Sequence, residues 1–194
     1  MNRWTLPEKA KINGRLYAIH ADFRDVLDIL TRLNKEEADA QTRLYVALAL
    51  FYEGFEAMPE RDYQEAAVWL MTFLNGGEED KGKPGPKLLD WEQDAGLIVS
   101  GVNKVAGREV RAMPFCHWWT FLGWFSAVGE GSLATVIGIR DKRRRGKKLL
   151  DWEQEYYREH REQVDFQKHY TDEEVEERKR LLALLDGDGS ETIR

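Results

Sequence analysis

The chain has 194 residues, a formal net charge of −6, and 42% hydrophobic and 33% charged residues, which fits one domain or one domain with a charged extension. Seven Trp, seven Tyr and eight Phe exclude a disordered chain, because disordered segments are poor in aromatic residues. The acidic balance gives no general attraction to nucleic acid or anionic membranes, and the single cysteine excludes an intrachain disulfide framework and a multi-cysteine zinc site.

Charged residues interrupt every apolar segment near the N-terminus, so we expect no secretion signal. The longest apolar stretches, near Val46–Phe55 and Phe115–Val128, are shorter than a membrane span and carry the pattern of one helix face. The sequence therefore predicts an intracellular protein that does not enter a membrane.

Residues 9–19 predict a β-hairpin around Asn13-Gly14. Both positions of a two-residue hairpin turn need positive φ, which Asn and Gly adopt most readily. Such a turn places four apolar side chains on one face of the hairpin: Ala10, Ile12, Tyr17 and Ile19.

The rest of the chain predicts helices, because apolar side chains recur with a helical period between capping and breaking residues. The expected helices run from Asp22 through Leu33 and over residues 36–55, 62–75, 90–105, 114–128, 132–139, 151–169 and 172–185. We therefore expect a mainly α fold, a helical bundle of about seven to eight helices with a small N-terminal β-hairpin.

The composition changes beyond Asp141, where about half of the residues are charged. This change predicts two parts: residues 1–140 form the hairpin and the helical core domain, and residues 141–194 form a basic linker and a charged helical C-terminal extension. Thr171-Asp172-Glu173-Glu174 is a capping box that opens the last expected helix.

One short sequence occurs twice. Residues 87–93, Lys-Leu-Leu-Asp-Trp-Glu-Gln, recur as residues 148–154. We interpret each copy as a helix start in which Asp is the cap, Gln closes the capping box and the leucines pack against the first turn. A partner shared by both copies is the alternative.

The segment Met113–Phe125 is the most aromatic part of the chain. Helical spacing places Trp118, Phe121, Leu122 and Phe125 on one face, which we expect to be buried. Three aromatic side chains then project from the flanks or the far side and are candidates for partner binding: Phe115, Trp119 and Trp124.

Nothing in the sequence predicts an enzyme. Cys116-His117 is the one Cys/His pair, and neither a second cysteine nor a suitably spaced histidine accompanies it. Packing within the aromatic segment is therefore its expected role. We predict no catalytic residue, no metal site and no cofactor.

Lys142–Lys148 carries six positive charges in seven residues. Three interpretations stay open: contacts to phosphates of nucleic acid, docking of an acidic protein partner, or a solvated linker. Arg143, Arg144 and Arg145 are therefore further candidates for partner binding.

Several motifs follow one another in a recognisable order over residues 5–175. They are the Asn-Gly hairpin with Asp22-Phe23-Arg24, Leu50-Phe51-Tyr52 before a proline, Trp69 to Asn75 before a glycine-rich loop, Asp90 to Ala95, His117-Trp118-Trp119-Thr120-Phe121, and Ile137 to Arg140. Together they resemble a family of tailed-bacteriophage proteins known as gene product fifteen, from phages that infect Gram-positive bacteria.

The resemblance implies a tail assembly chaperone. Such a non-enzymatic protein would bind the tape-measure protein during tail morphogenesis, with the major tail protein as a second partner, and would form homo-oligomers. It would act in the cytoplasm of the infected or prophage-carrying bacterial host. The alternatives are a structural tail component retained in the virion and a basic-patch nucleic-acid-binding phage protein; nucleic acid is the less expected partner.

Overall fold

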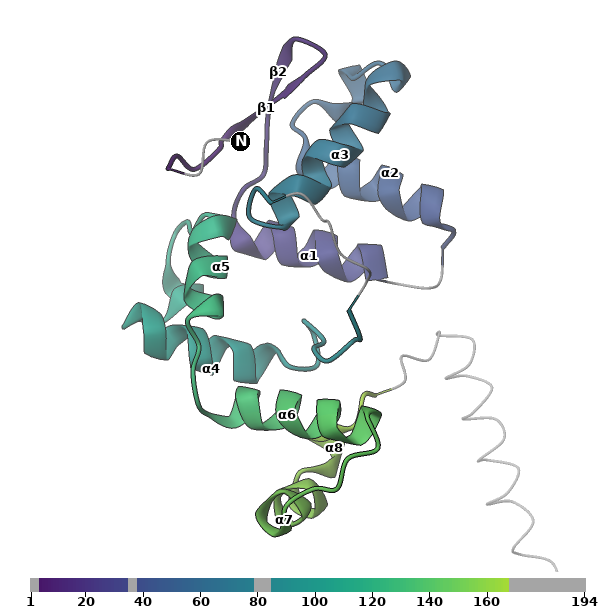
Figure 1. Cartoon of the computed structure of the whole chain (residues 1–194). Helices are drawn as coiled ribbons and strands as arrows, with labels where there is room; N and C mark the ends of the chain where they lie inside the picture. The colour runs from purple at the N-terminus through teal and green to yellow at the C-terminus, as the bar shows by residue number, and fades with distance from the viewer. Residues whose placement is uncertain (1–3, 35–37, 79–84, 168–194) are drawn as a thin grey trace, which may run out of the picture.

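The computed structural model of the chain describes residues 4–34, 38–78 and 85–167. Within them, a two-stranded antiparallel hairpin precedes eight α-helices, as Figure 1 shows. The predicted mainly helical fold with an N-terminal hairpin is therefore confirmed. The helix expected at residues 172–185 lies outside the described residues.

The strands are β1 (Lys9–Ile12) and β2 (Arg15–Ala18), and the helices are α1 (Phe23–Asn34), α2 (Ala40–Phe51), α3 (Tyr63–Leu74), α4 (Ala95–Ala106), α5 (Trp118–Ser126), α6 (Ser132–Arg144), α7 (Asp151–Glu159) and α8 (Arg161–Val164). Short 3-10 helices cover Phe55–Ala57, Glu60–Asp62 and Val110–Ala112. None of the helices in the described residues has both the length and the apolar character that crossing a membrane requires.

The hairpin turns where the sequence predicts. Asn13 and Gly14 have φ of 45° and 83°, as a two-residue hairpin turn requires. Ala10 and Ile12 are fully buried, and the Asn13 side-chain amide donates to Asp62 Oδ1 at 2.8 Å. The hairpin is thus held against the start of α3.

The main core lies between the hairpin and the helices α1 to α5. Its largest fully buried side chains include Phe51, Tyr52, Phe73, Trp118 and Phe121. Tyr52 donates its hydroxyl to the Ala66 carbonyl at 2.8 Å, so this buried polar group has a partner. The predicted burial of Trp118 and Phe121 is confirmed.

Two helices begin later than predicted. The helix expected from residue 90 begins at Ala95, because the Asp94 carboxylate accepts the Asp90 N–H at 2.9 Å and closes a separate turn. The helix expected from residue 114 begins at Trp118, because residues 113–116 form a bend and irregular backbone and Asp22 forms a β-bridge with His117.

Other helix ends differ as well. The helix expected over residues 36–55 is α2, which ends at Phe51; Gly54 then adopts φ of 67°, outside the helical region. The helix expected to end at residue 139 continues to Arg144 and includes the first half of the basic run. The helix expected over residues 151–169 breaks at His160 into α7 and α8.

The repeated helix start is used in two different ways. In the first copy, the Asp90 carboxylate accepts the N–H groups of Glu92 and Gln93 at 3.0 and 2.9 Å, but the helix follows only at Ala95. In the second copy, Asp151 is the first helical residue, and Glu153 accepts the Leu150 N–H at 2.8 Å. The predicted roles of Asp151 as cap and of glutamine as capping-box partner are therefore wrong.

A second, smaller apolar cluster joins α6 to α8. It contains Val136, Ile139 and Val164 and is bordered by Tyr156 and Tyr157 of α7. In Figure 1, α6, α7 and α8 lie together at the end of the molecule opposite the hairpin. The division of the chain into two parts at residue 140 stays a prediction.

Candidate functional site

The segment that leads into α5 is fixed by Asp22. The Cys116 N–H donates to Asp22 Oδ2 at 2.9 Å, and the Arg24 guanidinium donates to both Asp22 oxygens at 2.7 and 2.8 Å. Burial opposes ionisation of Asp22, but the Arg24 and Cys116 hydrogen bonds outweigh it and hold the Asp22 pKa below its usual value. Asp22 thus joins two motifs that lie far apart in the sequence.

His117 caps the N-terminus of α5. Its Nδ1 accepts the Trp119 N–H at 3.0 Å, and its Nε2 faces the Pro7 carbonyl at 3.1 Å. Because Nδ1 accepts a hydrogen bond, the ring is neutral and Nε2 carries the proton that is donated to Pro7. Burial lowers the pKa of His117, although the Pro7 carbonyl and the nearby Glu8 act in the opposite direction. The predicted packing role of the Cys116-His117 pair is confirmed.

The first two tryptophans of α5 are bonded to the end of α3. The indole N–H of Trp118 donates to the Leu74 carbonyl at 3.0 Å, and that of Trp119 to the Phe73 carbonyl at 2.9 Å. Gly77 has φ of 86°, and a Cβ there would lie 2.7 Å from Trp119 Cη2. The turn after α3 therefore requires glycine at this position, both for its backbone conformation and for the Trp119 ring beside it.

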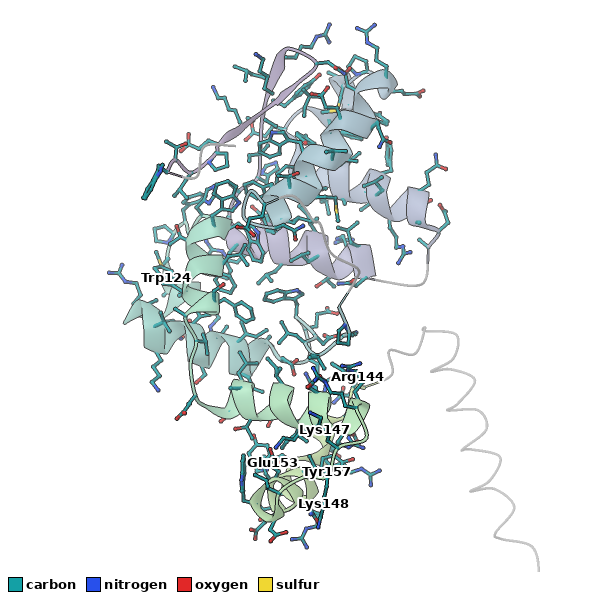
Figure 2. The ribbon with its side chains drawn as sticks, viewed as in Figure 1. Trp124, Arg144, Lys147, Lys148, Glu153 and Tyr157 are labelled. Carbon is teal, nitrogen blue, oxygen red and sulfur yellow. The ribbon has the colours of Figure 1, made fainter. Side chains whose placement is uncertain are left out.

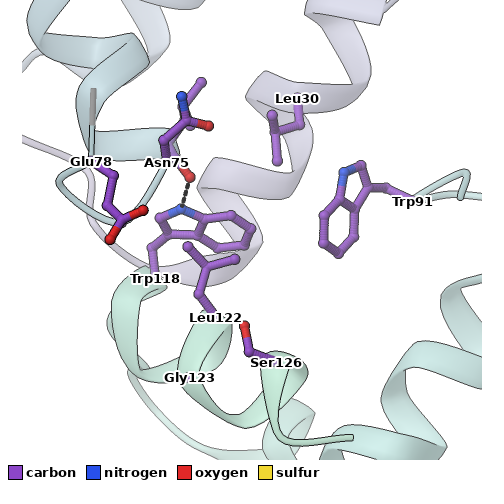
Figure 3. A pocket seen from close by; sticks show the side chains of 10 residues that line it. Leu30, Asn75, Glu78, Trp91, Trp118, Leu122, Gly123 and Ser126 are labelled. Carbon is purple, nitrogen blue, oxygen red and sulfur yellow. Dashed lines mark hydrogen bonds between the residues drawn. The ribbon is translucent and has the colours of Figure 1, made fainter. Parts of the chain in front are cut away.

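A cleft of about 780 Å³, lined by polar and apolar surface in nearly equal shares, lies between α1, the end of α3, the turn before α4, and α5. Figure 3 shows Leu30, Trp91, Trp118 and Leu122 around this space. The complete lining consists of Leu30, Leu74, Asn75, Gly76, Glu78, Trp91, Trp118, Leu122, Gly123 and Ser126. Gly76 and Gly123 have no side chain to fill it, so the backbone of the turn after α3 and of α5 borders the cleft directly.

The chemistry of this cleft suits packing. Five large apolar side chains form its walls, and the side chains of Asn75, Glu78 and Ser126 are the polar ones among the lining residues. Within the described parts of the chain, no three or more His, Cys, Asp or Glu residues group where they could hold a metal ion. The apolar side chains of this open cleft could contact the apolar face of an amphipathic helix.

The aromatic residues predicted to bind a partner lie outside the lining of the cleft. Phe115 is 54% exposed. Trp119 is half-buried and bonded to Phe73, and Trp124 is half-buried against the core. Figure 2 labels Trp124 on α5. Their role in partner binding stays a prediction.

The arginines of the basic run are paired within the chain. Arg143 forms an ion pair with Asp165 and lies 4.1 Å from the centre of the Tyr157 ring, while Arg144 and Arg145 both bond Asp141, at 3.2 and 2.9 Å. Burial opposes ionisation of Asp141, but these two arginines outweigh it and lower its pKa.

Lys142 is paired too. Its Nζ lies 2.6 and 2.8 Å from the two oxygens of Glu153. Lys147 and Lys148 are exposed, and Figure 2 shows both near α7 with Arg144 and Tyr157. Acidic side chains thus neutralise part of the positive charge of the basic run, which lies apart from the cleft.

One buried polar centre was not predicted from the sequence. Arg140 donates to both Asp94 oxygens at 2.6 and 2.9 Å, and also to the carbonyls of Leu88, Gln163 and Val164. Gln93 donates to the Asp165 carbonyl at 2.8 Å and accepts the Gln167 N–H at 3.0 Å. A signal was present, since both Asp94 and Arg140 belong to motifs noted from the sequence.

The chain is thus a mainly helical protein in which three of the sequence motifs, Trp69 to Asn75, Asp90 to Ala95 and His117 to Phe121, contribute residues to one cleft. It belongs to the family described as bacteriophage Gp15 protein, whose family model matches residues 4–166. The resemblance stated from the motifs is confirmed. Comparison with curated proteins gives no match, and comparison with solved structures gives none either.

Proposed function

We propose that this phage protein is a tail assembly chaperone that binds the tape-measure protein during tail morphogenesis and catalyses no reaction. The cleft between α1, α3 and α5, with its leucine and tryptophan side chains, supports this proposal most directly. Its walls carry leucines and tryptophans that can bury apolar side chains of a partner helix.

The cleft also fits the requirements of a transient chaperone. Trp118 and Leu74 are fixed by a hydrogen bond between the indole and the backbone, so the wall needs little reordering when a partner binds. Membership in the phage family supports the proposed setting, the cytoplasm of a bacterial host. Self-association and a contact with the major tail protein belong to the same proposal.

The pairing of the basic run favours a protein partner over nucleic acid. Arg143, Arg144 and Arg145 already bond Asp141 and Asp165, which reduces the positive charge offered to phosphates. A structural tail component is the other alternative, and it differs by its presence in purified virions.

Co-expression with the tape-measure protein of the same phage tests the proposal. Size-exclusion chromatography with light scattering should then show a soluble complex that contains several copies of this chain. A chain that elutes alone while the tape-measure protein precipitates would overturn the proposal. Detection of the chain in purified virions would instead support the structural alternative.

A further inference from the structure

We propose that the last described part of the chain is an arm that neighbouring copies exchange. The arm consists of α7, α8 and the three residues that follow them, residues 151–167. Its end lies in a site formed by α6 and the turn before α4, and the same site also binds the arm of a second copy. The inference rests on the proposed function only in that self-association belongs to that function, and it names the contact that links the copies.

The site binds the main chain of the arm. Gln93 Nε2 donates to the Asp165 carbonyl at 2.8 Å, and Gln93 Oε1 accepts the Gln167 N–H at 3.0 Å. Arg140 Nε donates to the Val164 carbonyl at 2.8 Å. Because these bonds are made to the backbone of a segment that every copy carries, the site can bind it from its own chain or from a second copy.

The site stays formed when the arm leaves. Arg140 donates to both Asp94 oxygens at 2.6 and 2.9 Å and to the Leu88 carbonyl at 3.0 Å, and these partners lie outside the arm. The turn before α4 therefore holds the Arg140 guanidinium in place without help from the arm. A donor that is already oriented needs little reordering when a new backbone segment binds.

Two side chains of the arm are also recognised. Val164 packs against Val136 and Ile139 of α6, and all three side chains are buried. The centre of the Phe166 ring lies 4.1 Å from the Arg140 guanidinium carbon, a favourable contact between a cation and an aromatic ring. A ligand of this site thus needs a small aliphatic residue followed two positions later by an aromatic one, which the arm of a second copy supplies.

The arm adds little to the core of its own copy. Within residues 145–167, all of which the structure describes, the buried residues are Glu153 and Val164, and no residue of this range belongs to the main core. Ion pairs join the arm to α6, among them that of Asp165 with the half-exposed Arg143, and salt screens exposed ion pairs. The arm can therefore leave α6 without opening the main core.

A short hinge separates the arm from α6. Gly146 follows the end of α6 with φ of 66°, and residues 147–150 have no regular secondary structure. Residues 146–150 span at most about 17 Å when extended, which allows the arm to reach an adjacent copy. The Tyr157 hydroxyl of α7 lies 3.1 and 2.9 Å from the two Asp165 oxygens, so we expect α7 and α8 to move together.

Exchange of the arm replaces contacts within one copy by the same contacts between two copies. Its cost is therefore limited to the opening of the hinge and the association of two chains. Copies that bind side by side along one tape-measure chain have a high effective concentration, which offsets the cost of association. Exchange would thus link neighbouring copies after they have assembled.

Two complementary variants test the exchange in the full-length protein. Val164→Asp brings a charge to the apolar part of the site, so this variant has an intact site and a defective arm. Gln93→Glu replaces the donating amide by an ionised carboxylate that only accepts hydrogen bonds, so this variant has a defective site and an intact arm. One variant is labelled with a donor fluorophore and the other with an acceptor, and energy transfer measures their association over a concentration series.

We expect this mixture to associate at least about tenfold more tightly than two control mixtures, because it alone pairs an intact site with an intact arm. In the controls, the double variant Val164→Asp/Gln93→Glu is mixed with each single variant in turn. Equal association in all three mixtures would overturn the proposal. Circular dichroism shows whether each variant is folded. If Val164→Asp is not, the milder Val164→Ser takes its place and should give the same order of affinities.

The exchange and the proposed function can fail separately. If the three mixtures associate equally while a soluble tape-measure complex forms, the exchange is wrong and the proposed function stands. If the complementary variants associate more tightly than the controls but the tape-measure protein precipitates, the exchange stands and the proposed function is wrong.

Discussion

Arg140 and Asp94 form a buried, two-bond ion pair that joins α6 to the turn before α4, with N–O distances of 2.6 and 2.9 Å. The Arg140 side chain is 4% exposed and that of Asp94 is fully buried. Since Arg140 also bonds three backbone carbonyls, all five of its N–H donors have partners. The pair thereby fixes Trp91, a wall of the cleft, relative to α6.

Asp94→Ala should destabilise the protein by about 3–5 kcal/mol, because Arg140 would stay buried without its counter-charge. Urea unfolding followed by circular dichroism measures this change. Asp28→Ala breaks the half-exposed ion pair with Arg32 and should cost less than about 1 kcal/mol. Equal effects of the two variants would show that the buried pair has no special importance.

Trp118→Ala should cost about 3–5 kcal/mol in the free energy of unfolding, because Trp118 is 1% exposed and its removal leaves a cavity. Phe115→Ala should change stability by no more than about 0.5 kcal/mol, since the Phe115 side chain is largely in solvent. Thermal unfolding of both variants tests the assignment. Normal stability of Trp118→Ala would contradict the assignment of Trp118 to the core.

His117 should make stability depend on pH. Its pKa in the folded state lies below the ordinary value of 6.5 because of burial, so the unfolded chain binds the proton more readily. Stability is therefore complete above about pH 6.5 and falls as the pH drops below that value. His117→Asn keeps a capping side chain and should flatten this dependence between about pH 6.5 and 5. If the stability of His117→Asn depends on pH as the wild type does, groups other than His117 cause the dependence.

Two glycines should respond to alanine in opposite directions. Gly77→Ala forces a Cβ to 2.7 Å from the Trp119 ring at positive φ. We therefore expect the free energy of unfolding to fall by about 1–3 kcal/mol. Gly123 lies in α5, and nothing lies within 4 Å of its added Cβ. Gly123→Ala should therefore stabilise the protein by about 0.5–1 kcal/mol. If the urea midpoints of both variants shift in the same direction from the wild type, either the steric requirement at Gly77 or the open space at Gly123 is wrong.

Local signals explain which elements were predictable. The hairpin depends on Asn13-Gly14 itself, and α3 stops at Asn75 before glycines with positive φ, so both follow from neighbouring residues. The start of α5 depends instead on Asp22, which binds the Cys116 N–H across 94 positions. A helical period contains no information about such a distant partner, so the predicted start at residue 114 was wrong.

The candidate site was predictable only in part. Leu122 was expected on a buried helix face from its spacing, and it lines the cleft together with Trp91. That Leu30 and the end of α3 meet them depends on how four elements pack, which spacing within one helix does not determine. The charges of the basic run were visible in the sequence, but their pairing with Asp165 and Glu153 depends on the break at His160 and on the start of α7.

The most direct test of the proposed function is the affinity of a tape-measure fragment for two neighbouring variants. Ser126→Lys places a charged side chain in the cleft, and Ala127→Lys places the same side chain one residue outside its lining. By isothermal titration calorimetry, we predict at least about tenfold weaker binding for Ser126→Lys and wild-type binding for Ala127→Lys. Wild-type affinity of both variants would contradict the assignment of the cleft as the tape-measure site.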